Sequence, residues 1–175
     1  MIETERLYLR EMTMQDFDAI ARILQDKDVM VAYEGAFDDT TVLAWIQNQK
    51  KRYIEDGFGL WAVVVKKTDS IIGQCGITLQ DVHEQRVKEI GYVFAKAYWH
   101  QGYAIEAAQA CKRYGFETLH AMNLYSIIRD TNQASKQVAL RNGMTCVDQI
   151  VKTYRGVVMP HEVYRITEEE YRTSK

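Results

Sequence analysis

Trp99-His100-Gln101-Gly102-Tyr103-Ala104 is the stretch that decides how this chain folds and what it binds. It follows an apolar segment, residues 89–94, and leads into apolar residues spaced for one face of a helix. A helix N-terminus presents backbone N–H groups without internal partners and a partial positive charge. None of the three residues before Gly102 is a Ser, Thr, Asp or Asn cap, and glycine lets a ligand approach the backbone closely. The stretch therefore predicts a phosphate-binding helix start, the alternative being one whose amides bind water.

Two better-known phosphate motifs do not fit this stretch. No Gly-Lys-Ser/Thr follows the glycine, so it is not a P-loop. The three-glycine fingerprint of dinucleotide-binding folds is also missing, and no early strand–helix–strand unit contains the glycine. These absences disfavour a nucleotide-binding switch protein.

Composition describes an ordinary soluble protein of one domain, residues 1–175, with 47% hydrophobic and 26% charged residues. A formal charge of −2 argues against a nucleic-acid partner, because such domains are usually strongly basic. The acidic opening Met1-Ile2-Glu3-Thr4-Glu5 does not resemble a signal peptide, and no apolar run is long enough for a membrane span. We therefore expect a cytoplasmic protein without a membrane partner.

The cysteines Cys75, Cys111 and Cys146 are odd in number and widely spaced, and they form no metal-ligand pattern. We expect reduced thiols that pack as small apolar residues, and no metal site. Cys111 stands on the apolar row of the helix after Gly102, where a buried thiol is inert, so we do not expect a catalytic cysteine.

Hydrophobic periodicity and turn residues give the order of elements along the chain. We expect strands at residues 7–10, 59–65, 71–79, 88–94, 124–128, 144–154 and 158–166. Helices are expected after a Thr13 cap, from about residue 39 to before Gly57, at 102–118 and at 132–141. This order predicts an α/β (α+β) fold with a mixed, mostly antiparallel sheet flanked by helices rather than a doubly wound parallel sheet.

Trp99-His100-Gln101-Gly102-Tyr103-Ala104-Ile105-Glu106-Ala107 resembles the acetyl-CoA motif of the GNAT N-acetyltransferase superfamily, specifically its RimJ/RimL-type branch. That branch commonly reads Trp-x-x-Gly-Tyr-Ala-x-Glu-Ala. Three further segments agree in order and spacing, so the resemblance spans nearly the whole chain: Thr4-Glu5-Arg6-Leu7-x-Leu9-Arg10, Glu89-Ile90-Gly91-Tyr92, and Asn132-x-x-Ser135 followed by Gly143-Met144.

The resemblance implies a GNAT-like sheet that splays between strands 88–94 and 124–128, with acetyl-CoA as cosubstrate in the cleft. The pantetheine would pair with the backbone of Tyr92, Val93 and Phe94, and Asn132 and Ser135 would contact it. The pyrophosphate would rest on the helix start formed by His100, Gln101, Gly102, Tyr103 and Ala104.

The resemblance also implies direct attack by an amine on the acetyl group, without an acyl-enzyme. Many family members protonate the leaving thiolate with a tyrosine seven residues after the motif asparagine, where this chain has Ala139, so the role moves to Ser135. Ser135 would otherwise be an ordinary first-turn helix residue. Glu89 is the candidate base, the alternative being a solvated charge at a strand end, and His83-Glu84 is better explained as a surface loop.

An α-amine has a pKa of about 7.7–8.0 and needs little help to lose its proton, whereas lysine has a pKa of about 10.4. A protein or peptide N-terminus is therefore the preferred acceptor. The alternatives are a small amine (polyamine, amino acid or antibiotic) and a CoA-binding sensor without activity. The resemblance also allows a homodimer.

Other residues are predicted to be structural. We expect Trp45, Trp61 and Trp99 to pack in the core, and Lys50-Lys51-Arg52 to form a solvated helix face. Lys96, Lys136 and Arg141 stand near enough in the sequence to reach the 3′-phosphate of CoA, although long basic chains near a site are common. Acceptor specificity is expected in the loops at residues 30–38 and 81–86.

Overall fold

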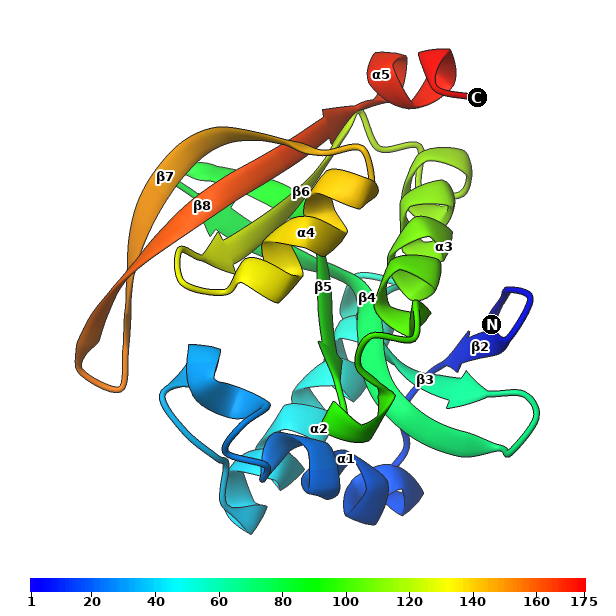
Figure 1. Ribbon diagram of the computed structural model, residues 1–175, viewed down its shortest axis with the longest axis vertical. Coiled ribbons are helices and arrows are strands. Elements are labelled where there is room, and N and C mark those ends of the chain that lie inside the picture. The colour runs from blue at the N-terminus through cyan, green and yellow to red at the C-terminus, as the bar shows by residue number, and fades with distance from the viewer.

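One sheet of eight strands runs through the molecule in the order β1-β2-β3-β4-β5-β6-β8-β7 (Figure 1). The computed structural model describes residues 1–175. The strands are β1 (Ile2–Glu3), β2 (Leu7–Arg10), β3 (Leu60–Val65), β4 (Ser70–Val82), β5 (Gln85–Phe94), β6 (Asn123–Arg129), β7 (Thr145–Tyr154) and β8 (Val157–Thr167). All neighbours are antiparallel except β5 and β6, so the predicted mixed, mostly antiparallel sheet is confirmed.

The sheet opens between its two central strands. β4 and β5 pair along their whole length, from Gly73↔Phe94 to Val82↔Gln85. β5 and β6 pair only where Glu89 meets Tyr125, and beyond that position the two strands separate. A parallel pair needs a crossover connection, which here is the 3₁₀ helix η3 (Lys96–Tyr98) followed by α3 (Tyr103–Glu117). The predicted splay is confirmed at these two strands.

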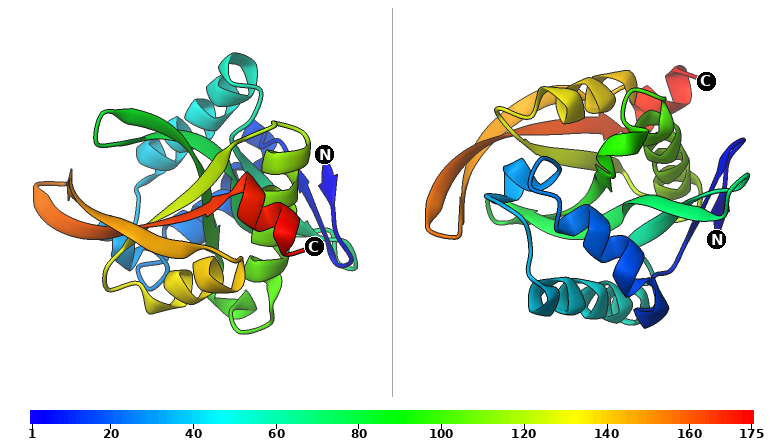
Figure 2. Two further views of the ribbon diagram at one scale, coloured as in Figure 1. Left: turned by 90° about the horizontal axis from the view of Figure 1, so that it is seen from above. Right: turned by 60° about the horizontal axis from the view of Figure 1, so that its bottom comes forward.

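Helices cover both faces of the sheet, as Figure 2 shows. The helices α1 (Phe17–Leu24) and α2 (Asp39–Glu55) lie on one face, and α3 and α4 (Gln133–Arg141) lie on the other. The remaining helices are short: η1 (Met14–Asp16), η2 (Met30–Tyr33) and the C-terminal α5 (Glu168–Thr173). None of the helices combines the length and apolar character that a membrane-spanning helix requires.

Each face of the sheet has its own hydrophobic core. The larger core joins the sheet to α3 and α4 and contains Cys75 and Cys111, whose sulfur atoms lie 3.6 Å apart in full burial. The smaller core holds α1 and α2 through residues such as Ile20 and Ile46. Each amphipathic helix buries its apolar side against the sheet, so a sheet with helices on both faces has two cores.

One glycine in the centre of the sheet allows two neighbouring backbone segments to pack closely. A Cβ atom on Gly76 in β4 would lie 2.0 Å from the carbonyl oxygen of Gly59, just before β3. Only a residue without a side chain fits there, which explains a glycine inside a strand that otherwise favours β-branched residues.

Most of the predicted elements are present, with ends shifted by a few residues. The first helix begins as predicted at Thr13, whose N–H donates to Asp16 Oδ2 over 2.8 Å, although its first turn is the 3₁₀ helix η1. Two short elements at the chain ends, β1 and α5, were not predicted because they lack a clear apolar period. The segment at 81–86 is not a loop but the end of the β4–β5 hairpin.

In α2, Val42 and Ile46 are buried and Leu43 is exposed. One packing prediction is wrong. Trp99 is 37% exposed rather than part of the core, whereas Trp61 is buried as expected. The Trp99 indole N–H donates to the Phe94 carbonyl over 2.9 Å, so its polar atom rather than its apolar ring fixes its position.

Candidate active site

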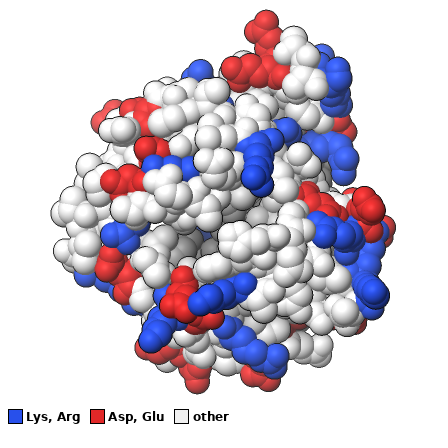
Figure 3. Space-filling view, in the orientation of Figure 1, with Lys and Arg blue, Asp and Glu red and all other residues white.

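A cleft of about 890 Å³ occupies the space where β5 and β6 separate. Figure 3 shows a hollow near the middle of the molecule, walled largely by uncharged side chains. One part, the helix half, is lined by the residues after η3 and by the first turns of α3 and α4. The other part, the hairpin half, is lined by η2, α2, the β7–β8 hairpin and the near end of β5. The cleft therefore has room for two ligands that meet near Glu89.

The helix half opens on the uncapped start of α3. Gly102 is the N-cap residue with φ +79°, a left-handed conformation that favours glycine, and no side chain caps the helix. The first helical hydrogen bond runs from Glu106 N–H to the Gly102 carbonyl over 3.1 Å. The N–H groups before Glu106 therefore have no partner within the helix, as the sequence predicted.

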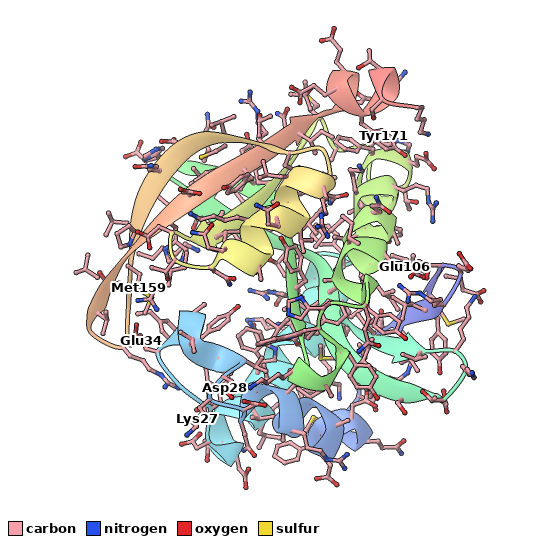
Figure 4. The ribbon with its side chains drawn as sticks, viewed as in Figure 1. Lys27, Asp28, Glu34, Glu106, Met159 and Tyr171 are labelled. Atoms are coloured by element: carbon pink, nitrogen blue, oxygen red, sulfur yellow. The ribbon has the colours of Figure 1, made fainter.

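Arg6 holds this helix start in place, which sequence reasoning did not foresee. Its Nε donates to Glu106 Oε2 over 2.7 Å, and its Nη1 donates to the Gln101 carbonyl over 3.0 Å. Its guanidinium also stacks 4.2 Å from the centre of the Tyr103 ring. Figure 4 shows Glu106 on the side of α3 that faces the N-terminal strands. The signal was available, since both charged residues lie in segments that the resemblance singles out.

Of the residues predicted at this helix start, His100, Gly102, Tyr103 and Ala104 line the cleft and Gln101 does not. Gln101 is exposed, and its side-chain amide donates to the Ala97 carbonyl over 2.9 Å. Its backbone carbonyl is bound by Arg6, so Gln101 contributes to the shape of the turn rather than to the wall of the cleft.

The start of α4 forms the opposite wall of the helix half. Asn132 caps this helix, because its Oδ1 accepts from Ser135 N–H over 3.2 Å. Ser135 lines the cleft, and its hydroxyl makes no hydrogen bond within the protein. Ala139 is buried in the larger core and does not line the cleft. The Asn132 side-chain oxygen is thus already engaged, while the Ser135 hydroxyl is free.

The open edge of β5 presents alternate backbone groups to the cleft. The Ile90 carbonyl accepts from Ser126 Oγ on the β6 side, and Ala95 N–H donates toward β4, to Ile72. Because successive residues of a strand point their backbone groups to opposite edges, the groups of Tyr92 and Phe94 face the cleft and those of Val93 face β4. Val93 lines the cleft with its side chain only, so the prediction that its backbone pairs with a ligand is wrong.

Tyr92 also crosses the cleft. Its hydroxyl donates to the Ser135 carbonyl over 2.7 Å, which ties β5 to the first turn of α4. Burial raises the pKa of this phenol well above its usual value, so Tyr92 stays protonated near neutral pH.

Glu89 lies at the junction of β5 and β6 and is half-buried. Its Oε2 accepts from Ile127 N–H over 2.6 Å. Burial raises the pKa of this carboxyl to about 7, against the opposing charges of Lys152 and Arg52 and the Ile127 hydrogen bond. The alternative of a solvated charge at a strand end is therefore wrong, because β5 begins four residues earlier at Gln85.

The other ionisable residues near this end of the sheet lie mostly outside the cleft, and His83 and Glu84 are at the surface as expected. His83 and Glu84 are exposed in the turn between β4 and β5, and His83 Nε2 lies 2.8 Å from Asp148 Oδ2. On β8, Glu162 accepts from Tyr164 and pairs with Lys136 over 3.1 Å, outside the cleft lining. Its neighbour His161 does line the cleft.

Aromatic rings line the hairpin half, which corrects the prediction that they serve the core alone. Tyr33 contacts Trp45 and Tyr154 edge-to-face, with ring centroids 6.0 Å apart in each pair. All three side chains line the cleft. The Trp45 indole N–H donates to Gln74 Oε1 over 2.9 Å, which fixes the ring.

Basic side chains complete the lining of the cleft. Arg52, predicted on a solvated face, lines it, whereas Lys50 and Lys51 of the same helix are exposed. Of the residues considered for a phosphate of CoA, Lys96 pairs with Asp28 over 2.9 Å and Lys136 with Glu162. Arg141 lines the helix half and forms no ion pair, so it alone of those residues remains available there.

No group of three or more His, Cys, Asp or Glu side chains is arranged to hold a metal ion. The cleft instead joins a helix start with free N–H groups to a carboxylate of raised pKa, at the one break in the sheet.

The family model described as "Acetyltransferase (GNAT) domain" matches residues 6–145. The chain belongs to the GNAT acetyltransferase family. It is 37% identical over 162 residues to the protein YkkB of Bacillus subtilis, covering 92% of each chain. It is 32% identical over 135 residues to the uncharacterized N-acetyltransferase p20 of Bacillus licheniformis, covering 75% of each. The crystal structure of a GNAT-family acetyltransferase from Bacillus anthracis superposes with a TM-score of 0.82 at 25% identity, covering 96% of this chain and 98% of that one.

This GNAT acetyltransferase is thus a transferase enzyme with the expected family fold. The match of the family model contains the uncapped α3 start, Glu89 and Ser135. The residues that line the hairpin half from β7 and β8 lie beyond that match, in the part of the chain that the family model does not describe.

Proposed function

We propose that this GNAT acetyltransferase is a RimJ/RimL-type enzyme that uses acetyl-CoA to acetylate the α-amine of a protein or peptide N-terminus. The observation that carries the proposal is the continuity of one cleft, which runs from the uncapped start of α3 to a carboxylate whose pKa is raised to about 7. A diphosphate fits the first end, and a weakly basic amine fits the second.

The residues of the helix half fit CoA. The free N–H groups and the positive end of the α3 dipole favour an anion. A Cβ atom on Gly102 would lie 3.3 Å from Arg6 Nη2, so a side chain there would disturb the turn that Arg6 holds. Arg141 adds a cation without an ion-pair partner. Tyr92 and Phe94 offer backbone groups of an open strand edge for an extended chain such as pantetheine. When bound there, acetyl-CoA supplies the acetyl thioester.

The chain's own residues then divide the proton transfers. Glu89, half-ionised near pH 7, accepts a proton from the incoming ammonium group at its carboxylate. The unbonded hydroxyl of Ser135 donates a proton to the leaving sulfur. The Phe94 N–H, which faces the cleft, is placed to donate to the oxyanion that develops on the acetyl carbonyl. Tyr92 holds β5 and α4 together across the site.

The pKa of Glu89 favours an α-amine over a lysine side chain. Moving a proton from an α-amine of pKa about 8 to Glu89 is uphill by about one unit, or about 1.4 kcal/mol. The same transfer from a lysine of pKa about 10.4 is uphill by more than three units, or about 4.6 kcal/mol. His161 also lines the hairpin half, but its own burial lowers its pKa, so it accepts a proton less readily than Glu89 does.

A further solved structure is consistent with this acceptor class without deciding it. RimL, a ribosomal L7/L12 alpha-N-protein acetyltransferase solved in complex with coenzyme A, superposes with a TM-score of 0.78 at 16% identity. At that identity the likeness concerns the fold alone. The acceptor proposal depends on the cleft and on Glu89.

The proposal is tested by calorimetry with acetyl-CoA and by mass spectrometry of peptides incubated with enzyme and acetyl-CoA. We expect micromolar binding and a gain of one acetyl group at the peptide N-terminus, but none on peptides with a blocked N-terminus and a free lysine. Ser135→Ala should lower kcat by about 10²-fold with unchanged acetyl-CoA affinity, whereas Ser70→Ala, outside the cleft, should not. Absence of acetyl-CoA binding would refute the proposal, and binding without turnover on any amine would indicate the sensor instead.

A further inference from the structure

The hairpin half of the cleft is rich in cations and contains a single carboxylate. Arg52 of α2, Arg129 of β6 and Lys152 of β7 all line it. The lining of the whole cleft contains two acids, Glu89 and Asp28. Asp28 is paired with Lys96 of η3, so Glu89 is the only acid without an ion-pair partner. A net charge of −2 for the chain thus hides a local excess of positive charge at this end of the cleft.

Arg52 and Lys152 have no carboxylate partner. Arg52 makes only a long hydrogen bond, 3.3 Å from its Nη1 to Gln49 Oε1, and Lys152 makes no ion pair or hydrogen bond. Both side chains are half-buried in the cleft wall rather than fully solvated. They lie close enough to Glu89 for their charges to act on its carboxyl. Positive charge in this part of the cleft therefore exceeds negative charge, because neither cation has a counter-ion and only one carboxylate lies near them.

Arg129 adds a third observation. It pairs with Glu34 over 2.8 Å and donates to the Val31 carbonyl, but its Nε is buried without a hydrogen-bond partner. Figure 4 shows Glu34 beside the β7–β8 hairpin, near Met159. A buried donor without a partner costs about 1–3 kcal/mol, which a bound acceptor atom would recover.

We propose that Arg52 and Lys152 bind an anionic group of the acceptor, so that the preferred substrate is a peptide whose N-terminal residue is Asp or Glu. This inference rests on the proposed function, because it assigns the substrate of the same site. The ammonium group of such a substrate lies toward Glu89, and the side-chain carboxylate lies toward Arg52 and Lys152. The two charged groups of this one substrate then each lie beside a side chain of opposite charge.

The same arrangement excludes the most basic acceptors. A polyamine or an aminoglycoside places a second positive charge a few atoms from its reacting amine, where it meets Arg52 and Lys152. Two like charges about 4 Å apart repel by about 4 kcal/mol at an effective dielectric constant of about 20. The small-amine alternatives that carry several positive charges are therefore disfavoured on the structure, whereas an acidic amino acid is not.

The experiment compares matched peptides that differ only in charge at the first residue, Asp against Asn and Glu against Gln. We expect kcat/KM for the acidic peptide of each pair to be about 10-fold higher with the unmodified enzyme, and the preference to weaken in 0.5 M salt. Calorimetry of both peptides with CoA-loaded protein gives the same comparison without turnover. We expect the acidic peptide to bind about 10-fold more tightly there as well.

Variants identify the residues responsible. Lys152→Gln and Arg52→Gln should each lower the acidic-to-neutral preference, measured as a ratio of kcat/KM, about 3- to 10-fold. Loss of either charge also acts on Glu89, but that effect is common to both peptides and cancels in the ratio. Lys50→Gln is the matched control, since it removes a charge from an exposed position of α2. Circular dichroism establishes that each variant is folded, and the comparison of peptides on the unmodified enzyme needs no variant at all.

The outcomes separate this inference from the proposed function. Equal use and equal binding of acidic and neutral peptides, with N-terminal acetylation observed, would overturn the inference and leave the proposed function standing. Free aspartate used far better than any peptide would support the anion site and overturn the peptide acceptor. Preference for acidic peptides that persists in both variants would refute the assignment to Arg52 and Lys152.

Discussion

Glu89→Gln should make the stability of this enzyme less dependent on pH. Unlike the replacement of most carboxylates, it should raise the free energy of unfolding at neutral and higher pH. Burial raises the pKa of Glu89 from 4.5 to about 7 in the folded protein. Between these two values the folded state keeps a proton that the unfolded state has released, so the unfolded state binds fewer protons. Stability therefore falls as the pH rises from about 4.5 to about 7, because folding then has to accommodate a buried charge.

The size of the effect follows from the same two values. A difference of 2.5 units corresponds to at most about 3.4 kcal/mol of stability lost above pH 7, at 1.36 kcal/mol per unit. Water reaches this half-buried carboxyl, so we expect about 1–3 kcal/mol. Glutamine has the same shape, and its side-chain oxygen still accepts from Ile127 N–H, so the variant isolates the charge.

Urea unfolding followed by tryptophan fluorescence at pH 5, 6, 7 and 8 measures the effect. We expect similar free energies of unfolding for both proteins at pH 5, and a Glu89→Gln variant that is about 1–3 kcal/mol more stable at pH 8. Glu106→Gln is the control of opposite sign. The hydrogen bonds of Thr4 and Arg6 outweigh the partial burial of Glu106 and lower its pKa, so this variant should be less stable at neutral pH and recover in acid.

This reasoning would be refuted if the free energies of unfolding of Glu89→Gln and of the unmodified protein differed by the same amount at every pH. It would mean that Glu89 titrates alike in the folded and unfolded states, and the proton transfer proposed for it would then lose its thermodynamic basis. A variant less stable at pH 8 than at pH 5, relative to the unmodified protein, would show that ionised Glu89 stabilises the fold.

Three further predictions follow from the packing. Gly102→Ala should weaken CoA binding at least 10-fold by calorimetry and lower the free energy of unfolding by about 1 kcal/mol, whereas Gly57→Ala, with the similar φ of +81° and open space around it, should lose only stability. Gly76→Ala should lower the free energy of unfolding by about 3 kcal/mol or more and reduce the Tm, because its Cβ meets backbone at 2.0 Å. In native protein a thiol reagent should modify Cys146 alone, since the other two cysteines are buried, and unfolding in denaturant should expose all three.

The architecture could be predicted from the sequence because most of its helices and strands have recognisable local patterns of apolar and turn residues. The apolar rows of α3 and of the central strands have clear periods, and Gly102 without a preceding cap residue marks the start of α3 in the right place. The short elements β1 and α5 could not be predicted, because a few residues at a chain end have no measurable period and form only against the rest of the structure.

The helix half of the cleft was predictable and the hairpin half was not. Ser135 and the residues around Gly102 lie in contiguous motifs, so their spacing alone brings them to one place. Arg52 and Lys152 are a hundred residues apart in the sequence, and they line one cleft only because α2 and β7 both reach the neighbourhood of Glu89. A three-residue basic cluster on a helix looks solvated until the tertiary structure shows which of its members faces inward. The orientation of the Val93 backbone likewise depends on the register between β4 and β5.

The single paired position between β5 and β6 has a consequence for how the specificity of this enzyme can evolve. The strands before this position and the strands after it form two half-sheets, each fully paired within itself. Strand pairing joins them only where Glu89 meets Tyr125, and the side chains of Ser126 and Glu89 add hydrogen bonds across the same junction. The helix half of the cleft is built from a few contiguous residues, whereas the hairpin half is assembled from η2, α2 and the β7–β8 hairpin, which project from both half-sheets. Substitutions in those projecting parts can alter which amine is chosen while the seam and the helix start stay intact, so a lineage can acquire new acceptors without rebuilding its acetyl-donor end.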